Sequence, residues 1–387
     1  EFNTFQAFWG STLHDGVFGV EQTAEAYPIG FTGATLNEAA AKVRKPSNAE
    51  LEISFFETVN MGAGQYSGNP WLLEMPDPVT RCSWGNYLTI PVSWDGGNSW
   101  NAFMNLNDNE LRGKADRVDL EIGGRTETVT AVRQFGQMPG TLGLALGFGR
   151  QTTGRLGNAM GERIGVDVYP WLTLDANGNT QYYAEVNSVS DKVGEEEEFA
   201  CVQYHHTMGV TTRDENGEVV MDESTGEPFN VDEKTLMEVG SGFQGALTDR
   251  SVIYRGSLEE LDDLVHHIEE KRSEAQKLNA NTLYPYEEYK DELYSQGHWW
   301  AMHVDLNACI GCGACQVACI AENNVPIVGK KEVSRHHEMT WLRIDRYFYG
   351  DYENPNVVYQ PLMCQHCDNA PCENVCPVAA TPHSSEG

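Results

Sequence analysis

Apolar and polar residues alternate through much of the first half of the chain, and this pattern predicts strands. LEISFFETV (51–59) is typical of a strand, and RVDLEIGGRTETVTAVRQ (117–134) alternates on both sides of a Gly-Gly pair, as a β-hairpin does. TLNEAAAKVRK (35–45) has the composition of a helix. We therefore expect residues 1–190 to form a mixed, strand-rich domain.

The clearest helical pattern lies in SLEELDDLVHHIEEKRSEAQKL (257–278), whose apolar residues recur at helical spacing. Ser257 and Glu260 have the spacing of a capping box at its start. His266 and His267 are neighbours on this helix, about 100° apart, so they cannot both face one metal ion. We expect both on the surface or in helix packing.

Changes in composition divide the rest of the chain. Residues 191–256 form an acidic excursion or linker, which contains the run EEEE and a hairpin signal at ENG. Residues 257–300 supply the amphipathic helix and an aromatic linker. Residues 301–387 contain most of the cysteines and are expected to form a separate domain.

The overall charge excludes some classes of function. The chain has 26 basic and 57 acidic residues, a net charge of −31, which argues against nucleic acid and against anionic lipid as partners. No apolar run approaches about 18 residues, so no transmembrane segment is expected. The chain begins at Glu1 without a targeting segment, and we expect it to be an internal fragment of a longer protein.

Eight of the ten cysteines lie between 309 and 376, in two motifs. The motifs are CxxCxxCxxxC (Cys309, Cys312, Cys315 and Cys319) and CxxCxxxxCxxxCP (Cys364, Cys367, Cys372 and Cys376). Three cysteines spaced by three can surround one cubane iron–sulfur cluster in a single loop, and Gly311 and Gly313 let that loop turn tightly. The fourth cysteine, displaced from this rhythm, is expected to ligate a different cluster.

Zinc is the alternative metal, because paired CxxC knuckles make Cys₄ zinc sites. Zinc does not account for CxxCxxCxxxC or for the CxxxCP ending, so we favour iron. Cys82 and Cys201 lie apart from the motifs and are expected to be buried apolar residues rather than ligands.

Two features near the motifs leave alternatives open. His366 lies within the second motif and either hydrogen-bonds a cluster sulfur or faces solvent. Residues 329–348 hold five Lys or Arg against three Asp or Glu. This excess of positive charge either stabilises reduced clusters or forms ordinary surface ion pairs.

The two motifs and their spacer resemble the four-cluster ferredoxin subunits of the complex iron–sulfur molybdoenzymes, such as polysulfide and dimethyl sulfoxide reductases. LNACIGCGACQVACIAENNVPIVGKKEVSR, MTWLRIDRY and FETVNMGAGQYSGNPWLLEMPDPVTRCSWGNYL are similar, more narrowly, to the large iron–sulfur subunit of bacterial alternative complex III, a quinol oxidase assembly. The resemblance covers most of 1–190 and all of 300–387. NPWLLEMPDPVTRCSWGNY (69–87) carries the narrower likeness.

This resemblance implies an α+β chain, in which a strand-rich, molybdopterin-oxidoreductase-like terminal β-barrel domain precedes an incomplete ferredoxin-like iron–sulfur domain. It implies [4Fe-4S] clusters, with one [3Fe-4S] cluster as an option, and no molybdopterin. The implied function is electron transfer from quinol toward a cytochrome, by a subunit without catalytic residues. The implied partners are a membrane quinol-oxidising subunit, haem c subunits and the remaining part of the same subunit, at the periplasmic face of the bacterial cytoplasmic membrane.

The resemblance also bears on how the cysteines are shared. Eight cysteines taken alone suggest two clusters, in which the last cysteine of each motif completes the other motif's cluster. In the four-cluster pattern, a fourth motif completes the first and a third motif completes the second. Each motif of this chain would then supply three ligands to one cluster and one ligand to another. The chain would thus contribute to four different clusters. We favour this pattern because the x4 spacing of the second motif and the long spacer fit it better.

The competing function is a fragment of a catalytic molybdopterin oxidoreductase, in which residues 1–190 would cover a pterin. Stoichiometric molybdenum or tungsten would identify that alternative. A third alternative, a zinc-stapled structural module, would be colourless and free of iron.

Overall fold

The computed structural model of the chain describes residues 4–15, 51–91, 114–150, 163–203, 257–279, 301–349, 354–365, 367 and 370–382. Contacts divide the chain into two compact units, Glu1–Asn48 and Ala49–Gly387. The first unit contains α1 (Phe5–Asp15), along which the rings of Phe5 and Trp9 stack with centroids 6.1 Å apart. The helix predicted at 35–45 lies outside the described residues.

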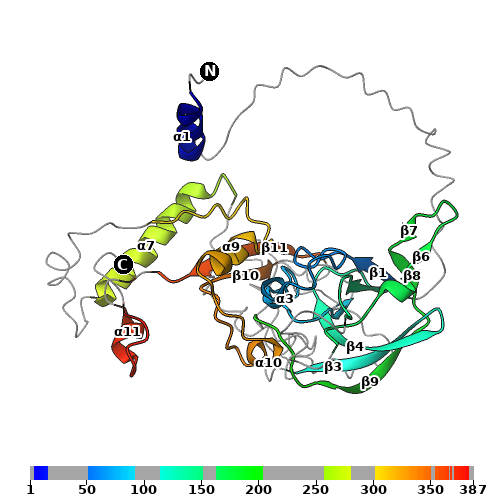
Figure 1. Cartoon of the computed structure of the whole chain (residues 1–387). Helices are drawn as coiled ribbons and strands as arrows, with labels where there is room; N and C mark the ends of the chain where they lie inside the picture. The colour runs from blue at the N-terminus through cyan, green and yellow to red at the C-terminus, as the bar shows by residue number, and fades with distance from the viewer. Residues whose placement is uncertain are drawn as a thin grey trace. The chain divides into compact units, whose positions relative to one another are not determined.

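The second unit holds the described strands and the other described helices (Figure 1). In chain order they are β1 (Glu52–Phe56), α3 (Pro70–Glu74), β2 (Leu88–Pro91), β3 (Ala115–Ile122), β4 (Arg125–Gln134), β5 (Thr141–Ala145), the 3-10 helix η2 (Tyr169–Trp171), β6 (Thr173–Leu174), β7 (Thr180–Gln181), β8 (Tyr183–Glu185), β9 (Ser188–Glu196), α7 (Leu261–Asn279), α9 (Ala314–Glu322), α10 (Lys330–Val333), β10 (Leu342–Tyr349), β11 (Asn356–Met363) and α11 (Pro371–Val375). This mixture of helices and strands confirms the predicted α+β class.

The hairpin predicted at 117–134 is confirmed. β3 and β4 pair antiparallel, with Ile122 opposite Arg125 across a two-residue turn. Gly123 and Gly124 form that turn with φ of 58° and 79°, which a type I′ turn requires and glycine adopts without strain. The strand predicted at 51–59 is confirmed as β1.

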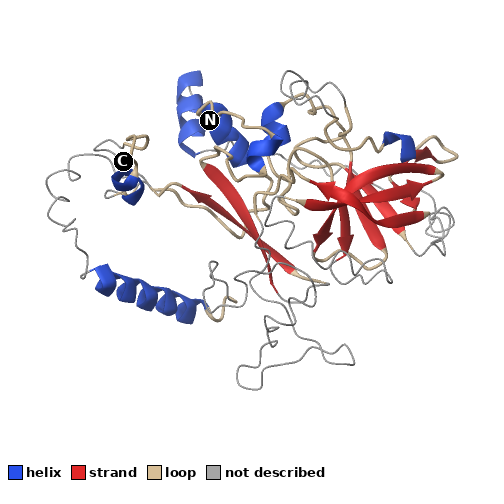
Figure 2. Ribbon diagram, turned by 90° about the horizontal axis from the view of Figure 1, so that it is seen from below, coloured by secondary structure: helices blue, strands red, loops and turns tan. Residues whose placement is uncertain are grey.

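Seven strands form one mixed sheet in the order β8-β1-β5-β2-β4-β3-β9. The pairs β1–β5 and β2–β4 are parallel, and the other neighbours are antiparallel. The expected closed β-barrel is not formed by the described strands, because β8 and β9 are the two ends of this order. Only Val186 and Asn187 separate β8 from β9 in the chain, so the two ends of this order lie close together and the sheet is curled (Figure 2). The molybdopterin-oxidoreductase-like identity of this region stays a prediction.

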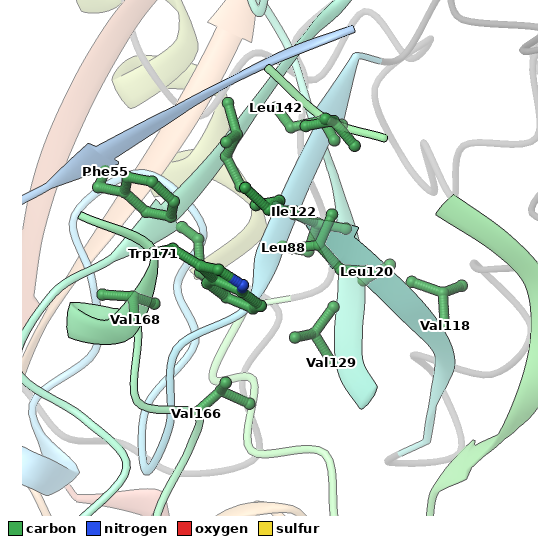
Figure 3. Packing of buried hydrophobic residues seen from close by; sticks show 14 of the residues in the cluster. Phe55, Leu88, Val118, Leu120, Ile122, Val129, Leu142, Val166, Val168 and Trp171 are labelled. Carbon is green, nitrogen blue, oxygen red and sulfur yellow. The ribbon is translucent and has the colours of Figure 1, made fainter. Parts of the chain in front are cut away.

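One hydrophobic cluster forms the core of this sheet. Figure 3 shows side chains of several strands gathered near Trp171, among them Leu88 and Leu120. Leu88 and Leu120 are fully buried, and the rings of Trp171 and Phe55 stack with centroids 6.2 Å apart. Burial of a side chain of this size stabilises the folded state by about 1.5–3 kcal/mol.

The helix predicted at 257–278 is confirmed as α7. The N–H of Ser257 donates to Glu260 Oε2 at 2.7 Å, which is half of the predicted capping box. His266 and His267 are exposed, in agreement with the predicted surface position. The apolar stripe is also largely exposed, for example at Leu258, which is 87% exposed.

The predicted domain limits are only partly covered by the described residues. β9 runs through the boundary predicted at 190, and the part of the acidic excursion from 204 to 256 lies outside the described residues, including its hairpin signal. The division into four segments stays a prediction. Within the described ranges, none of the helices is long and apolar enough to cross a membrane.

Candidate iron–sulfur site

The first cysteine motif occupies a loop and the beginning of α9. Gly311 and Gly313 have φ of 68° and 75°, as a tight turn requires. A Cβ at Gly311 would lie 2.4 Å from the ring of Tyr359, and a Cβ at Gly313 would lie 2.8 Å from Met75 Sδ. Both positions therefore need glycine, because the loop packs closely against β11 and against the end of α3.

The thiols of Cys309 and Cys312 lie within electrostatic range of the Cys315 thiol. Burial raises the pKa of the Cys315 thiol, the N–H groups of Gln316 and Cys315 oppose this, and the charges of Cys309 and Cys312 add to it. In the described part of the chain, no three His, Cys, Asp or Glu side chains meet at the spacing of a single metal ion. A cubane cluster is larger than one ion and takes its thiolates at its corners.

Cys319 is set apart from these three thiols by the helix. It lies in α9, four residues after Cys315, which is about 6 Å of helix rise. Asn323 Nδ2 lies 3.6 Å from its sulfur and donates to its carbonyl oxygen at 2.9 Å. Cys319 therefore belongs to the regular helix, whereas the other three belong to the loop and its entry into the helix.

The second motif begins where β11 ends. Its exposed members are Cys364, Cys367 and Cys372. Cys376 is partly buried, and the N–H of Ala380 donates to its sulfur at 3.2 Å. This N–H and those of the neighbouring residues after the Cys-Pro step lower the pKa of the Cys376 thiol. Converging N–H donors of this kind stabilise a thiolate.

Strand β11 leads away from the first motif. Tyr359, which packs on the loop of that motif, is followed by four residues that end at Met363, a rise of about 14 Å. The second motif therefore starts at a distance from Gly311. His366 lies outside the described residues, so its predicted role is not tested.

A buried carboxylate joins the cysteine domain to the sheet region. Glu74 is 7% exposed, and its Oε2 accepts N–H bonds from Val328 at 3.1 Å and from Gly329 at 2.9 Å. The indole of Trp84 donates to the same oxygen at 3.3 Å. Burial raises the pKa of Glu74, although these three donors lower it. The next residue, Met75, contacts the cysteine loop, so this junction fixes α3 beside that loop.

Two buried arginines lie near Tyr359, which packs on the same loop, and Arg346 is opposite Tyr359 in the β10–β11 pair. Arg81 and Arg346 are each 2% exposed. The N–H of Arg346 donates to Gln203 Oε1 at 2.8 Å, and Gln203 Nε2 donates to the Arg346 carbonyl at 2.6 Å. Burial raises the pKa of Tyr359, and the charges of both arginines and of Cys309 also act on its hydroxyl. The Arg81 and Arg346 guanidinium groups, together with the Asp77 carboxylate, therefore lie within electrostatic range of Tyr359, which packs on the loop of the first motif.

The other basic residues between the motifs are mostly in ion pairs. These are Lys330–Glu196 at 2.9 Å, Arg335–Glu332 at 3.3 Å and Arg343–Asp345 at 3.1 Å. Ordinary pairing thus accounts for three of the five cations in 329–348. The buried Arg346 is the member of this set that lies opposite Tyr359.

Cys82 and Cys201 are 4% and 2% exposed, which confirms their predicted burial. They belong to one buried cluster that also contains Tyr87 and Phe199. None of the eight motif cysteines is buried to this degree. The two groups of cysteines therefore have different surroundings.

Comparison with known proteins agrees with the motif chemistry. Residues 308–380 match the family model of the 4Fe-4S dicluster domain. The chain is 40% identical over 92 residues to the iron–sulfur cluster-binding subunit of menaquinone reductase from Nitratidesulfovibrio vulgaris, covering 23% of this chain and 34% of the relative. It is 36% identical over 114 residues to a tetrathionate reductase subunit of Salmonella typhimurium (28% and 40%), and 34% identical over 86 residues to the iron–sulfur subunit of arsenate respiratory reductase from Shewanella sp. (22% and 32%).

The chain contains a 4Fe-4S ferredoxin-like domain. Iron–sulfur clusters are its cofactors and electron transfer is the associated function, so zinc no longer competes as the metal. Thiol donors, glycine turns and N–H groups directed at sulfur all fit such clusters. The match to these three relatives spans about a third to two fifths of their length.

Residues outside the motifs that support the loop were not identified from the sequence. Glu74, Met75 and Arg81 all lie in 69–87, the segment that carried the narrower resemblance. A glutamate between apolar residues, as in WLLEM, is a signal for a buried carboxylate with partners. Tyr359 had no such signal, because an aromatic residue in a strand is ordinary core composition.

Proposed function

We propose that this chain is an iron–sulfur electron-transfer subunit of a membrane-associated quinol oxidoreductase of the alternative complex III type. With [4Fe-4S] or [3Fe-4S] clusters bound, the subunit would relay electrons from quinol toward a cytochrome acceptor. The contact between segment 69–87 and the first cysteine loop carries the proposal, because this segment has the narrower likeness and supports the motif. The relative named as a menaquinone reductase subunit supports the link to quinone chemistry.

The proposed ligands are the thiolates of Cys309, Cys312, Cys315, Cys319, Cys364, Cys367, Cys372 and Cys376. Clusters bound by such thiolates supply one-electron transfer, and no side chain of this chain performs acid–base or nucleophilic chemistry. The role of the chain is to space the clusters, exclude water and set the local charge.

Several described residues suit that role at the first motif. Gly311 and Gly313 allow the loop to turn, and Met75 and Tyr359 cover one side of it. The buried guanidinium group of Arg346 adds positive charge near this side of the loop, which favours the more negative, reduced state of a nearby cluster.

Metal analysis of the anaerobically purified protein tests the function. We expect iron and acid-labile sulfide, broad absorbance near about 400 nm and a paramagnetic signal on reduction. The variant Arg125→Ala is the control, because it lies in the exposed hairpin of the sheet region, touches no thiol and should retain all the iron. Stoichiometric molybdenum or tungsten would contradict the proposal and favour the catalytic molybdopterin fragment.

Paired variants test how the cysteines are shared. If Cys376 completes the cluster of the first motif, Cys315→Ser and Cys376→Ser change the same electron paramagnetic resonance signal. In the four-cluster pattern that we favour, the two variants change different signals. Loss of one common signal would establish the two-cluster arrangement instead.

The proposed partners are a membrane quinol-oxidising subunit, haem c subunits and the remaining part of the same iron–sulfur subunit. The proposed location is the periplasmic face of the bacterial cytoplasmic membrane. A net charge of −31 would speed the encounter with a basic cytochrome. We expect the rate of cytochrome reduction by the assembly to fall as ionic strength rises, and an insensitive rate would remove this support.

A further inference from the structure

Cys82 and Cys201 lie directly opposite each other in an antiparallel bridge. The flanking hydrogen bonds run from Ser83 N–H to Ala200 O at 2.9 Å and from Val202 N–H to Arg81 O at 3.0 Å. The two cysteines therefore form a non-hydrogen-bonded pair, in which the Cα atoms are about 4.5 Å apart and the side chains approach most closely. This separation falls within the range spanned by disulfide bonds.

The two sulfurs also share their surroundings. The Thr80 carbonyl oxygen lies 3.5 Å from Cys82 Sγ and 3.9 Å from Cys201 Sγ. Both side chains are buried in one cluster beside Tyr87 and Phe199. Two cysteines in a facing pair, with sulfurs near one atom, are a more specific arrangement than two independent buried apolar residues.

We propose that Cys82 and Cys201 form a disulfide bond in the protein as it occurs in an oxidising compartment. The thiolate of one cysteine attacks a sulfur of a disulfide-bearing thiol oxidoreductase or of a small disulfide, and one oxidant thiolate leaves. The second protein thiolate then displaces the remaining oxidant sulfur. Two electrons pass to the oxidant, which becomes two thiols with the two protons that the cysteines lose. Because the pair is buried in the folded protein, this reaction takes place during folding, before the hydrophobic cluster around the two cysteines excludes the oxidant.

The bond would join the two segments of the sheet region that contact β10 of the cysteine domain. Val79, three residues before Cys82, accepts a hydrogen bond from the Arg346 guanidinium. Gln203, two residues after Cys201, exchanges two hydrogen bonds with the Arg346 backbone. The disulfide therefore links the two segments that jointly bind Arg346 of β10. The disulfide proposal rests on the proposed periplasmic location, because disulfides persist in oxidising compartments.

Peptide mapping tests the bond in the full chain isolated from its own cells. Thiols are blocked in acid without reductant, and the protein is then cleaved with trypsin. Cys82 and Cys201 fall in the separate tryptic peptides 82–112 and 193–213. We expect one linked peptide whose mass is about 2 Da below the sum of the two, and which separates into them on reduction.

Three results would overturn the proposal: recovery of the two peptides separately with both cysteines blocked, linkage of either cysteine to a motif cysteine, or a linked mass that survives reduction. The Cys82→Ser variant should yield free peptide 193–213 blocked at Cys201. If that variant does not fold, comparison of the wild-type digest with and without reductant gives the same answer. The iron content measured for the proposed function is a separate readout, so the two proposals fail independently.

Discussion

The sheet region (51–203) and the cysteine domain (301–382) are stabilised in different ways. The sheet region has a fully buried apolar core, and its two cysteines lie in a buried cluster. In the cysteine domain, all eight motif cysteines are exposed or partly exposed. The same residue type is thus a core component in one region and a candidate ligand in the other. We infer that the sheet region is stabilised by its buried apolar side chains. The cysteine domain depends on its iron–sulfur clusters and on contacts with the sheet region.

Removal of the clusters should have the largest effect and should separate the two regions. We expect a chelator under oxidising conditions, or the Cys312→Ala variant, to abolish amide protection in 309–322 while β3 and β4 keep theirs, because only the former region depends on metal ligation. Hydrogen exchange followed by mass spectrometry measures both in one sample. Equal loss of amide protection in both regions would show that the two regions do not differ in their dependence on metal ligation.

Truncation in the sheet core should show the opposite pattern. Leu120 is fully buried in the core of the curled sheet. We expect Leu120→Ala to lower the free energy of unfolding by about 2–5 kcal/mol, because it removes apolar contacts and leaves a cavity. Chemical denaturation followed by tryptophan fluorescence measures this change. The absorbance of the clusters in the native protein should be unchanged, and a loss of iron in this variant would show that the regions are not separable.

The junction at Glu74 should have an intermediate effect. Glu74→Ala leaves two backbone N–H groups and the Trp84 indole without their carboxylate acceptor. We expect the free energy of unfolding to fall by about 1–3 kcal/mol and the amide hydrogens of Val328 and Gly329 to exchange faster. The control is Glu322→Ala, which removes an exposed glutamate at the end of α9 in the cysteine domain. Similar losses in both variants would show that the junction has no special role.

The same carboxylate gives the junction a dependence on pH. Burial raises the folded-state pKa of Glu74 above its ordinary value of 4.5, so the folded state favours the protonated acid. Its contribution to stability is complete below about pH 4.5 and is lost as the pH rises through the folded pKa. We therefore expect the denaturation midpoint of the wild type to fall relative to Glu74→Gln as the pH rises above 4.5. Parallel profiles for the two proteins would contradict this assignment.

An exposed ion pair in the sheet region should matter least. Arg125 and Glu127 lie 2.8 Å apart at the surface of the hairpin, and the arginine side chain is 43% exposed. We expect Arg125→Ala to cost about 0.2–1 kcal/mol in unfolding free energy, because solvent screens the pair. A larger cost would mean that the hairpin end contributes more to the sheet than its burial indicates.

The sequence predicted elements well where local chemistry decides the backbone. The Gly-Gly turn between β3 and β4 requires positive φ at both positions, and the helix beginning near Ser257 carries its own cap. The α+β class, which the resemblance implied, agrees with these patterns. The closed barrel was wrong, because the order of the strands depends on pairings between segments far apart in the sequence, such as β1 with β5, and no strand carries a local signal for its partner.

The candidate site was predicted unevenly for a similar reason. Spacing identified the cysteine motifs and the two glycines, because ligand geometry acts over a few residues. The support at Glu74 lies far from the motifs in sequence and meets the cysteine domain only in the fold, whereas Arg346 lies in the basic segment between the motifs. The long spacer, which favoured the four-cluster pattern, includes the two paired strands β10 and β11, so its length is weaker support for that pattern than the spacing inside the motifs.

The β10–β11 hairpin has a consequence for how related chains are recognised. The strands pair residue by residue from Leu342–Met363 to Tyr349–Asn356, so the chain travels out along one strand and returns along the other. Insertions beyond the Tyr349–Asn356 pair would lengthen the sequence between the motifs without moving either motif. A search that fixes the number of residues between the two motifs will therefore miss genuine relatives, whereas one that fixes only the spacing inside each motif will find them.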